Sequence, residues 1–265
     1  MKMNNEIKEF NAKFDKKIME IQIVTGSSAF GGAKGPGEEL WEASIDITAW
    51  KLINDKNICG ERYFLRTKAD MEYLNELRGK ILPDTICSVK VRQKENKFLL
   101  VEITGKGIID NELENILKEQ TKPVIYKDKT LGKFVLDKRF DEYTGKIKWN
   151  NKRIKMAITK YTGEMLDKVF IAANEFIREQ EMWDRRIKEF AANKLAKLKN
   201  TSWLEEDEEE ITADEFIKKI KAESINISLK NKFEVYFDDG EIFWGHSIVV
   251  SGNFEKGPLR ADIAG

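Results

Sequence analysis

The chain has 265 residues, of which 41% are hydrophobic and 35% charged, and its 46 basic residues balance 46 acidic ones. This length and apolar content exclude global disorder and fit two domains of ordinary size. A net charge of zero gives no long-range field, which disfavours an undifferentiated nucleic-acid or membrane-surface binder. We therefore expect another protein as the partner, no membrane, and nucleic acid only as a disfavoured alternative.

The cysteines and the single histidine restrict the chemistry further. Cys59 and Cys87 are far apart and form no CxxC pattern, so we expect two free thiols packed as small hydrophobes. Zinc sites built on His and Cys clusters lack ligands here, and no cofactor motif is present. The charged N-terminus does not resemble a secretory signal, and no run approaches the ~20 apolar residues of a membrane helix. These features predict a reduced, cytoplasmic protein without a cofactor.

Residues 1–121 predict an N-terminal β-rich domain. Spaced apolar residues predict a helix within 1–19, and another pattern of this kind predicts one at 69–81. Alternating patterns predict strands at 19–23, 40–52, 61–67, 85–93 and 97–105. Three strands, a helix and a hairpin is the order of an OB-type barrel. A connecting helix at 110–120, with Asp110 as its N-cap, and a linker at Pro123 would follow.

Residues 122–265 predict a C-terminal α+β domain, in which an antiparallel sheet packs against long helices. Three strands at 132–160 precede a helical stripe from Thr162 to Lys199, with a bend expected between Gln180 and Asp184. The acidic run 204–210 reads as a solvated loop or as the start of the next helix, where Thr212 and Glu215 form a capping box. Further strands would close the domain. We thus expect an α+β protein with an OB-like barrel first.

The Gly-rich segment 26–39 resembles a phosphate-binding loop only in part. Gly26 and Gly31 have the first spacing of a P-loop, but Gly32 replaces the lysine and a strand follows. We expect a mobile surface loop or, second, a partner-binding loop. The candidate binding residues are Gly26, Phe30, Gly31, Gly32 and Trp41.

The only histidine, His246, is the first catalytic candidate. Asp239 or Glu241 could orient it as a general base, and the carboxylates of Asp238, Asp239 and Glu241 could alternatively hold Mg²⁺ or Ca²⁺. Against this, the DDG sequence predicts a tight hairpin turn. Strand alternation after that turn would place His246 between Trp244 and Ile248 on one face. The pattern favours a packed structural histidine, and the catalytic residues stay unknown.

A third candidate surface lies in the N-terminal barrel. Trp41, Trp50, Tyr63 and Phe64 could stack on single-stranded nucleic acid. Residues 1–105 carry 17 basic and 16 acidic residues, which is weak electrostatic support. We therefore interpret these aromatics mainly as core and edge cover.

Three segments carry a resemblance to a known family: LGKFVLDKRFDEYTGKIKWNNKRI, LKNTSWLEEDEEEITADEF and FEVYFDDGEIFWGHSIVVSGNFEKGPLRADIAG. Together they span roughly residues 125–265 and resemble a bacterial domain-of-unknown-function family, number twenty-two sixty-two. The N-terminal half, with IVTGSSAFGGAKGPGEELW, is similar to the uncharacterised domain often joined in front of it. The resemblance implies a two-domain bacterial protein and transfers no activity.

These observations favour a non-enzymatic protein-binding module of immunity or regulatory type. The first alternative is a metal-assisted hydrolase that uses Asp239, Glu241 and His246. The second is single-strand nucleic-acid binding through the N-terminal barrel.

Overall fold

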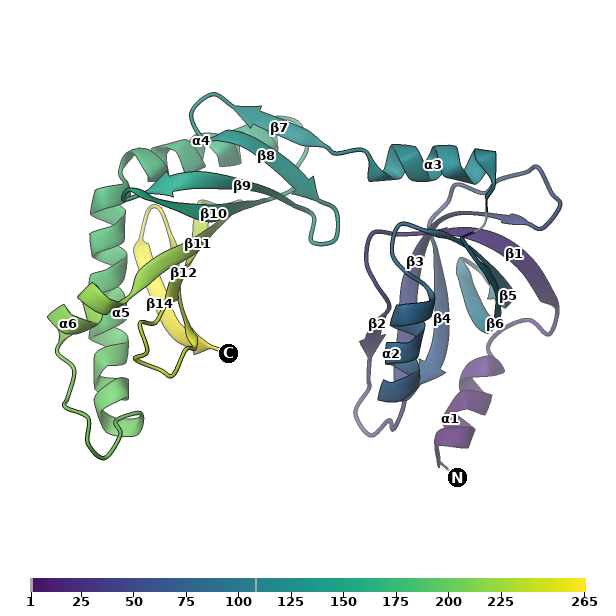
Figure 1. Ribbon diagram of the computed structural model, residues 1–265, viewed down its shortest axis with the longest axis horizontal. Coiled ribbons are helices and arrows are strands. Elements are labelled where there is room, and N and C mark those ends of the chain that lie inside the picture. Colours follow the sequence, from purple (N-terminus) through teal and green to yellow (C-terminus); the bar gives the residue numbers. More distant parts are fainter. Residues whose placement is uncertain (1, 108) are drawn as a thin grey trace. The chain divides into compact units, whose positions relative to one another are not determined.

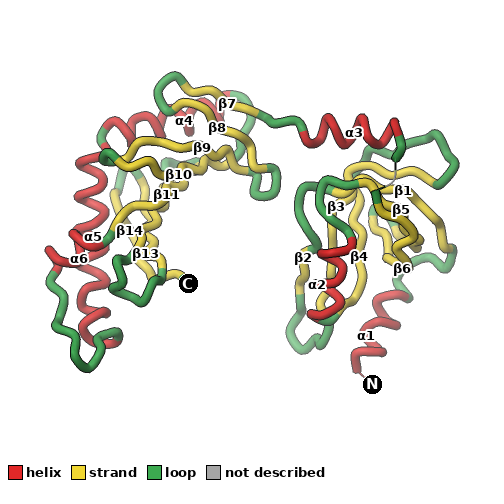
Figure 2. Tube along the Cα trace, viewed as in Figure 1, coloured by secondary structure: helices red, strands yellow, loops and turns green. Residues whose placement is uncertain are grey.

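A computed structural model describes residues 2–107 and 109–265 of the chain. The chain forms two compact units, Met1–Lys122 and Pro123–Gly265. Both contain helices and mainly antiparallel strands (Figures 1 and 2), so the predicted α+β class is confirmed. None of the helices in the described ranges has the length and apolarity needed to cross a membrane.

Five strands of the first unit close into a barrel. They are β1 (Ile18–Thr25), β3 (Trp41–Leu52), β4 (Tyr63–Ala69), β5 (Ile86–Lys94) and β6 (Lys97–Lys106). Each pairs with its neighbours in the circular order β1, β3, β4, β6, β5, and only β4 and β6 run parallel. Helix α2 (Met71–Lys80) lies between β4 and β5 in the chain. This topology confirms the predicted OB-like barrel.

The barrel core follows the sequence alternation. In β3, Ala43, Ile45 and Ile47 are buried and point inward, while the residues between them are partly exposed. Both cysteines are free thiols as predicted, and burial raises the pKa of Cys87 to about 12.

Two helices flank the barrel. Helix α1 (Lys2–Asn11) ends earlier than residue 19, and Phe10 and Phe14 pack with Leu99 instead. Helix α3 (Asn111–Thr121) starts at the predicted N-cap Asp110, whose carboxylate accepts from two backbone amides of the first turn. The buried ammonium of Lys51 on β3 forms an ion pair with Asp110, so α3 is fixed to the barrel.

The second unit is built on one eight-stranded sheet. Its strands are β7 (Ile125–Asp128), β8 (Gly132–Asp137), β9 (Glu142–Trp149), β10 (Lys152–Thr159), β11 (Lys221–Ser228), β12 (Lys232–Asp238), β13 (Ser247–Asn253) and β14 (Gly257–Ala264), in sequential order. The predicted antiparallel sheet is present except at β10 and β11, which are parallel. The helical crossover between these two strands makes a parallel pairing possible.

Helices cover only one face of this sheet (Figure 1). The predicted long stripe is divided into α4 (Glu164–Arg178) and α5 (Gln180–Ser202), with the break at Glu179, just before the expected range. Phe176 of α4 stacks on Trp149 and Phe233 of the sheet and on Phe254. The short helix α6 (Ala213–Lys219) has the predicted capping box.

The barrel core yields the first prediction. Phe98 is fully buried against Trp50 and Tyr63, whereas Phe64 is only half-buried beneath the guanidinium of Arg62. Phe98→Ala should lower the free energy of unfolding of the first unit by about 4 kcal/mol, because it leaves a cavity. Phe64→Ala, the control, should cost much less. Urea unfolding followed by circular dichroism measures both, and equal losses would contradict the packing.

Candidate functional site

The segment around His246 is a loop and not a strand. Strand β12 ends at Asp238 and β13 begins at Ser247, so residues 239–246 connect them; we call this segment the signature loop. The two strands do pair as an antiparallel hairpin, but the predicted tight DDG turn is wrong. Trp244 and Gly245 have φ values of 56° and 80°, in the positive-φ region, which no non-glycine residue of a strand adopts in the described structure.

Asp239 holds the signature loop in this shape. Its side chain is buried, and Oδ1 accepts from the amide of Glu241 at 3.1 Å. Oδ2 accepts from the amides of Phe243 at 2.6 Å and Gly245 at 3.2 Å. One carboxylate thus satisfies three backbone donors that a strand would have paired with its neighbour. Asp239, the second aspartate of the DDG sequence, therefore stabilises the longer loop that is present in place of the expected tight turn.

His246 is oriented by a backbone carbonyl. Its Nδ1 lies 2.7 Å from the oxygen of Phe243, which can only accept, so Nδ1 carries the proton and Nε2 of the neutral ring is an acceptor. The imidazole meets the ring of Trp203 edge-on at 5.4 Å, and the backbone of Gly265 lies against it. No hydrogen bond from Asp239 or Glu241 reaches the ring in the described part of the chain.

The structure separates the three residues predicted to share a strand face. Ile248 is fully buried, His246 is partly exposed, and Trp244 is 56% exposed. That prediction is wrong because the left-handed backbone at Trp244 turns its side chain away from the core.

The candidate acidic residues do not converge on a common point. Asp238 accepts from the amide of Gly240 at 2.9 Å, and Glu241 is exposed with a φ of 65°. Both oxygens of Asp239 are engaged by backbone amides. Among residues 2–107 and 109–265, no three His, Cys, Asp or Glu side chains gather in a metal-holding group. The carboxylates of Asp238 and Asp239 therefore serve to fix the backbone of the loop, and the loop forms a surface of defined shape.

Three rings form that surface, which we call the aromatic patch: Trp203, Trp244 and His246. Trp203 ends helix α5, and its ring lies 4.7 Å from that of Trp244. Phe243, fully buried, meets Trp203 edge-on at 5.5 Å and anchors the patch to the core. The patch joins two segments that are distant in the sequence, the end of α5 and the signature loop.

An acidic loop, residues 204–210, begins directly after Trp203. Glu208 forms an ion pair with Lys199, a fully buried lysine that also donates to the carbonyl of Trp203 at 2.8 Å. The other carboxylates are exposed and make no ion pair within the described ranges: Glu205, Glu206, Asp207, Glu209 and Glu210. The predicted solvated loop is confirmed, but it is tied to the aromatic patch through Lys199.

Sequence reasoning missed Lys199, although a signal was present. It lies four residues after Leu195, on the buried stripe of α5, at a spacing that is typical of an apolar residue. A lysine at such a position indicates a buried cation with a dedicated partner.

The five candidate binding residues of the Gly-rich segment are packed onto the barrel. Phe30 is buried and its carbonyl accepts from Arg78 at 3.0 Å. Gly31 and Gly32 belong to a short strand, β2 (Gly31–Ala33), paired with β3. A Cβ at Gly26 would lie 2.9 Å from Asp46, and Trp41 packs on the core beneath Lys34. The segment is therefore partly ordered strand, unlike the expected free loop.

The proposed nucleic-acid surface of the barrel is largely occupied by internal contacts. The rings of Trp50 and Tyr63 pack on Phe98. Glu42 of β3 pairs with Arg66 of β4, and Asp46 of β3 pairs with Arg62, the residue just before β4. The carboxylates neutralise Arg62 and Arg66, which are therefore less available to bind the phosphates of a nucleic acid.

Two family models match the chain, one over most of each compact unit. Residues 128–263 match the model of the family described as "Uncharacterized protein conserved in bacteria (DUF2262)". The chain belongs to this family. Residues 6–120 match "Domain of unknown function (DUF7021)", so the resemblance seen in both halves of the sequence is confirmed.

No curated protein matches the chain. A solved structure described as "Molecular basis for abrogation of activation of pro-inflammatory cytokines" is 14% identical and covers 56% of this chain and 80% of its own, with a TM-score of 0.21.

The role of Asp239 can be tested against its neighbour. Asp239→Ala removes the acceptor of three amides and should cost about 3 kcal/mol of unfolding free energy in the second unit, because the amides stay buried without partners. Asp238→Ala loses one exposed bond and should cost about 1 kcal/mol or less. Chemical unfolding measures both, and similar losses would show that Asp239 does not organise the loop.

Glu208 makes the second unit pH-sensitive. The hydrogen bond from Lys199 holds the pKa of this carboxyl below its usual value. A lowered folded-state pKa stabilises the fold fully above the unfolded pKa, and this contribution is lost as the pH falls through the folded pKa. The stability difference between wild type and Glu208→Gln should therefore shrink on acidification from neutral pH. A difference that stays constant during denaturation between pH 7 and pH 3 would contradict the ion pair.

Proposed function

We propose that the chain is a non-enzymatic protein-binding module that captures a basic protein on a surface made of the aromatic patch and the acidic loop. The observation that carries the proposal is Trp244, a large aromatic held 56% exposed in a left-handed conformation. A bulky residue there is strained by on the order of 1–3 kcal/mol, and such strain concentrates at functional positions.

The loop is prepared for binding before a partner arrives. Three backbone amides of the loop donate hydrogen bonds to the Asp239 carboxylate, and the ring of His246 is hydrogen-bonded to the carbonyl oxygen of Phe243. These bonds fix the backbone on both sides of Trp244. A partner would therefore lose little entropy in ordering this surface. Exposed tryptophans on rigid supports are the residues that most often dominate protein interfaces.

Charge selects the class of partner. Five carboxylates without ion pairs in the described structure follow Trp203 directly, and carboxylates of one sign attract a basic surface and speed encounter. Lysine or arginine side chains of that partner can also lie over the faces of Trp203 and Trp244. A basic protein thus fits both parts of the surface. Occupation of such a partner by this module would give an immunity-type or regulatory effect.

Affinity capture with matched variants tests the proposal. The tagged full chain is incubated with lysate of its own organism, and captured complexes are examined by native mass spectrometry. Wild type should retain a basic protein in fixed stoichiometry. Trp244→Ala should reduce its recovery at least about tenfold, as for a hot-spot residue. Phe140→Ala is the control, because Phe140 is an exposed aromatic, 69% exposed, on the β8–β9 turn.

The charge contribution is measured separately. Replacement of Glu205, Glu206 and Glu209 by glutamine should weaken the captured complex most at low salt, because exposed charges are screened at high ionic strength. A partner retained equally by Trp244→Ala, a captured protein that is acidic, or the lack of any stoichiometric partner would each contradict the proposal.

A further inference from the structure

We propose that the second unit binds a small ligand carrying several phosphate groups in a hollow beside β8, β9 and β10. The hollow has a volume of about 630 Å³, within the range of small-molecule sites. Four cations line it: Lys133 of β8, Lys146 and Lys148 of β9, and Arg153 of β10. The inference does not depend on the proposed function, since it concerns other residues and a ligand of opposite charge.

These cations are arranged at an energetic cost to the fold. Lys148 lies directly opposite Arg153 in the β9–β10 ladder, and Lys146 lies opposite Lys155. Lys127 and Lys133 face each other in the same way on β7 and β8. Like charges in opposite positions destabilise a sheet. The four lining cations are all exposed, and no ion pair of the described structure neutralises them.

The composition of the hollow favours phosphate as the anion. No Asp or Glu is among its described lining residues, so nothing within it neutralises the cations or repels an anion. Ammonium groups and the fork of Arg153 together supply donors for several oxygens in a small volume. Phosphate groups concentrate negative charge in this way, whereas an extended acidic peptide spreads its carboxylates along the chain at roughly 7 Å per alternate residue.

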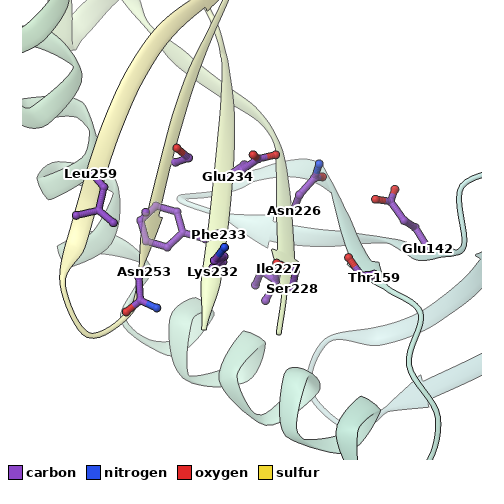
Figure 3. A pocket seen from close by; sticks show the side chains of 12 residues that line it. Glu142, Thr159, Asn226, Ile227, Ser228, Lys232, Phe233, Glu234, Asn253 and Leu259 are labelled. Carbon is purple, nitrogen blue, oxygen red and sulfur yellow. The ribbon is translucent and has the colours of Figure 1, made fainter. Parts of the chain in front are cut away.

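A long nucleic acid fits this face less well than a small ligand. Single strands bind where aromatic rings stack on their bases. The outward positions between the cations are Val135, Thr144 and Ala157, which offer no ring. Farther along the sheet, Glu142 and Glu234 line a separate hollow of about 400 Å³ (Figure 3), and both would repel a passing phosphate backbone.

The rest of the lining suits an organic portion of the ligand. Leu131, Ile147 and Ile177 form an apolar part of the wall. Gln180, at the start of α5, accepts from the amide of Asn150 at 2.8 Å, which leaves its side-chain nitrogen as a donor toward a ligand. Cations beside an apolar wall match a phosphorylated organic molecule such as a nucleotide.

The nearest carboxylates compete little with the ligand. Asp184 accepts from the indole of Trp149 at 3.0 Å and pairs with Lys188 at 3.1 Å. Glu181 and Asp184 both line an adjoining hollow that also includes Lys148, so Lys148 is the one cation of the site that shares a hollow with carboxylates in the described structure. Three of the four lining cations therefore remain wholly available.

Calorimetric titration of the full chain with ATP, without divalent cations and at low salt, tests the site. Wild type should bind one equivalent with a dissociation constant below about 1 mM. Lys148→Gln combined with Arg153→Gln should weaken binding at least about tenfold. Lys221→Gln combined with Lys232→Gln is the control, because it removes two exposed cations of the same sheet, on β11 and β12, that do not line the hollow. The control should change the affinity less than about twofold.

A thermal unfolding scan shows that the variants remain folded. Without ATP, the Lys148 and Arg153 double variant should melt no lower than wild type, because it loses a like-charge pair. With ATP, the melting temperatures of wild type and of the control variant should rise, whereas that of the Lys148 and Arg153 double variant should rise less. The site is wrong if wild type does not bind ATP or if the control loses as much affinity. It is also wrong if a twelve-nucleotide oligothymidylate or a polyglutamate peptide binds the same residues more tightly than ATP.

Discussion

Helices α4 and α5 cover only one face of the eight-stranded sheet, and the chemistry of the second unit depends on this one-sided burial. The aromatic rings around Phe176 hold the covered face together. Alternation along each strand then sends every second side chain to the open face, where cations of β7 to β10 accumulate. The same burial sets the end of α5, where Lys199 and Trp203 position the acidic loop and the aromatic patch.

The net charge of zero does not reveal that basic and acidic residues are clustered at different places in the second unit. Basic and acidic residues balance over the whole chain, which argues correctly against a uniform electrostatic field. Within the second unit, however, four cations without an ion pair in the described structure share one hollow, while five carboxylates without one share one loop. The second unit therefore has two charged surfaces of opposite sign, one on the acidic loop after α5 and one beside β8 to β10, on which the two binding proposals rest. A zero sum therefore restricts long-range steering without excluding local charged sites.

Elements with a strong local pattern could be predicted from the sequence. The β3 alternation, the Asp110 cap and the capping box of α6 all have local causes, and the structure has each of them. The signature loop could not be predicted in the same way. Its alternating sequence pattern predicts a strand, but the Asp239 carboxylate accepts three hydrogen bonds from backbone amides of the loop instead. Sequence alternation does not reveal these hydrogen bonds. The hollow on β8 to β10 was missed because it requires the strand register, which brings Lys148 opposite Arg153.

Amide hydrogen exchange in the signature loop tests the account most directly. The central claim is that Asp239 holds residues 239–246 in a preformed turn that presents Trp244. The amides of Glu241, Phe243 and Gly245 should be protected in wild type and should exchange rapidly in Asp239→Ala, while the amide of Val250 in β13 stays protected in both. Alternating protection from Phe243 through Ile248 that survives Asp239→Ala would instead indicate a continuous strand and contradict the account.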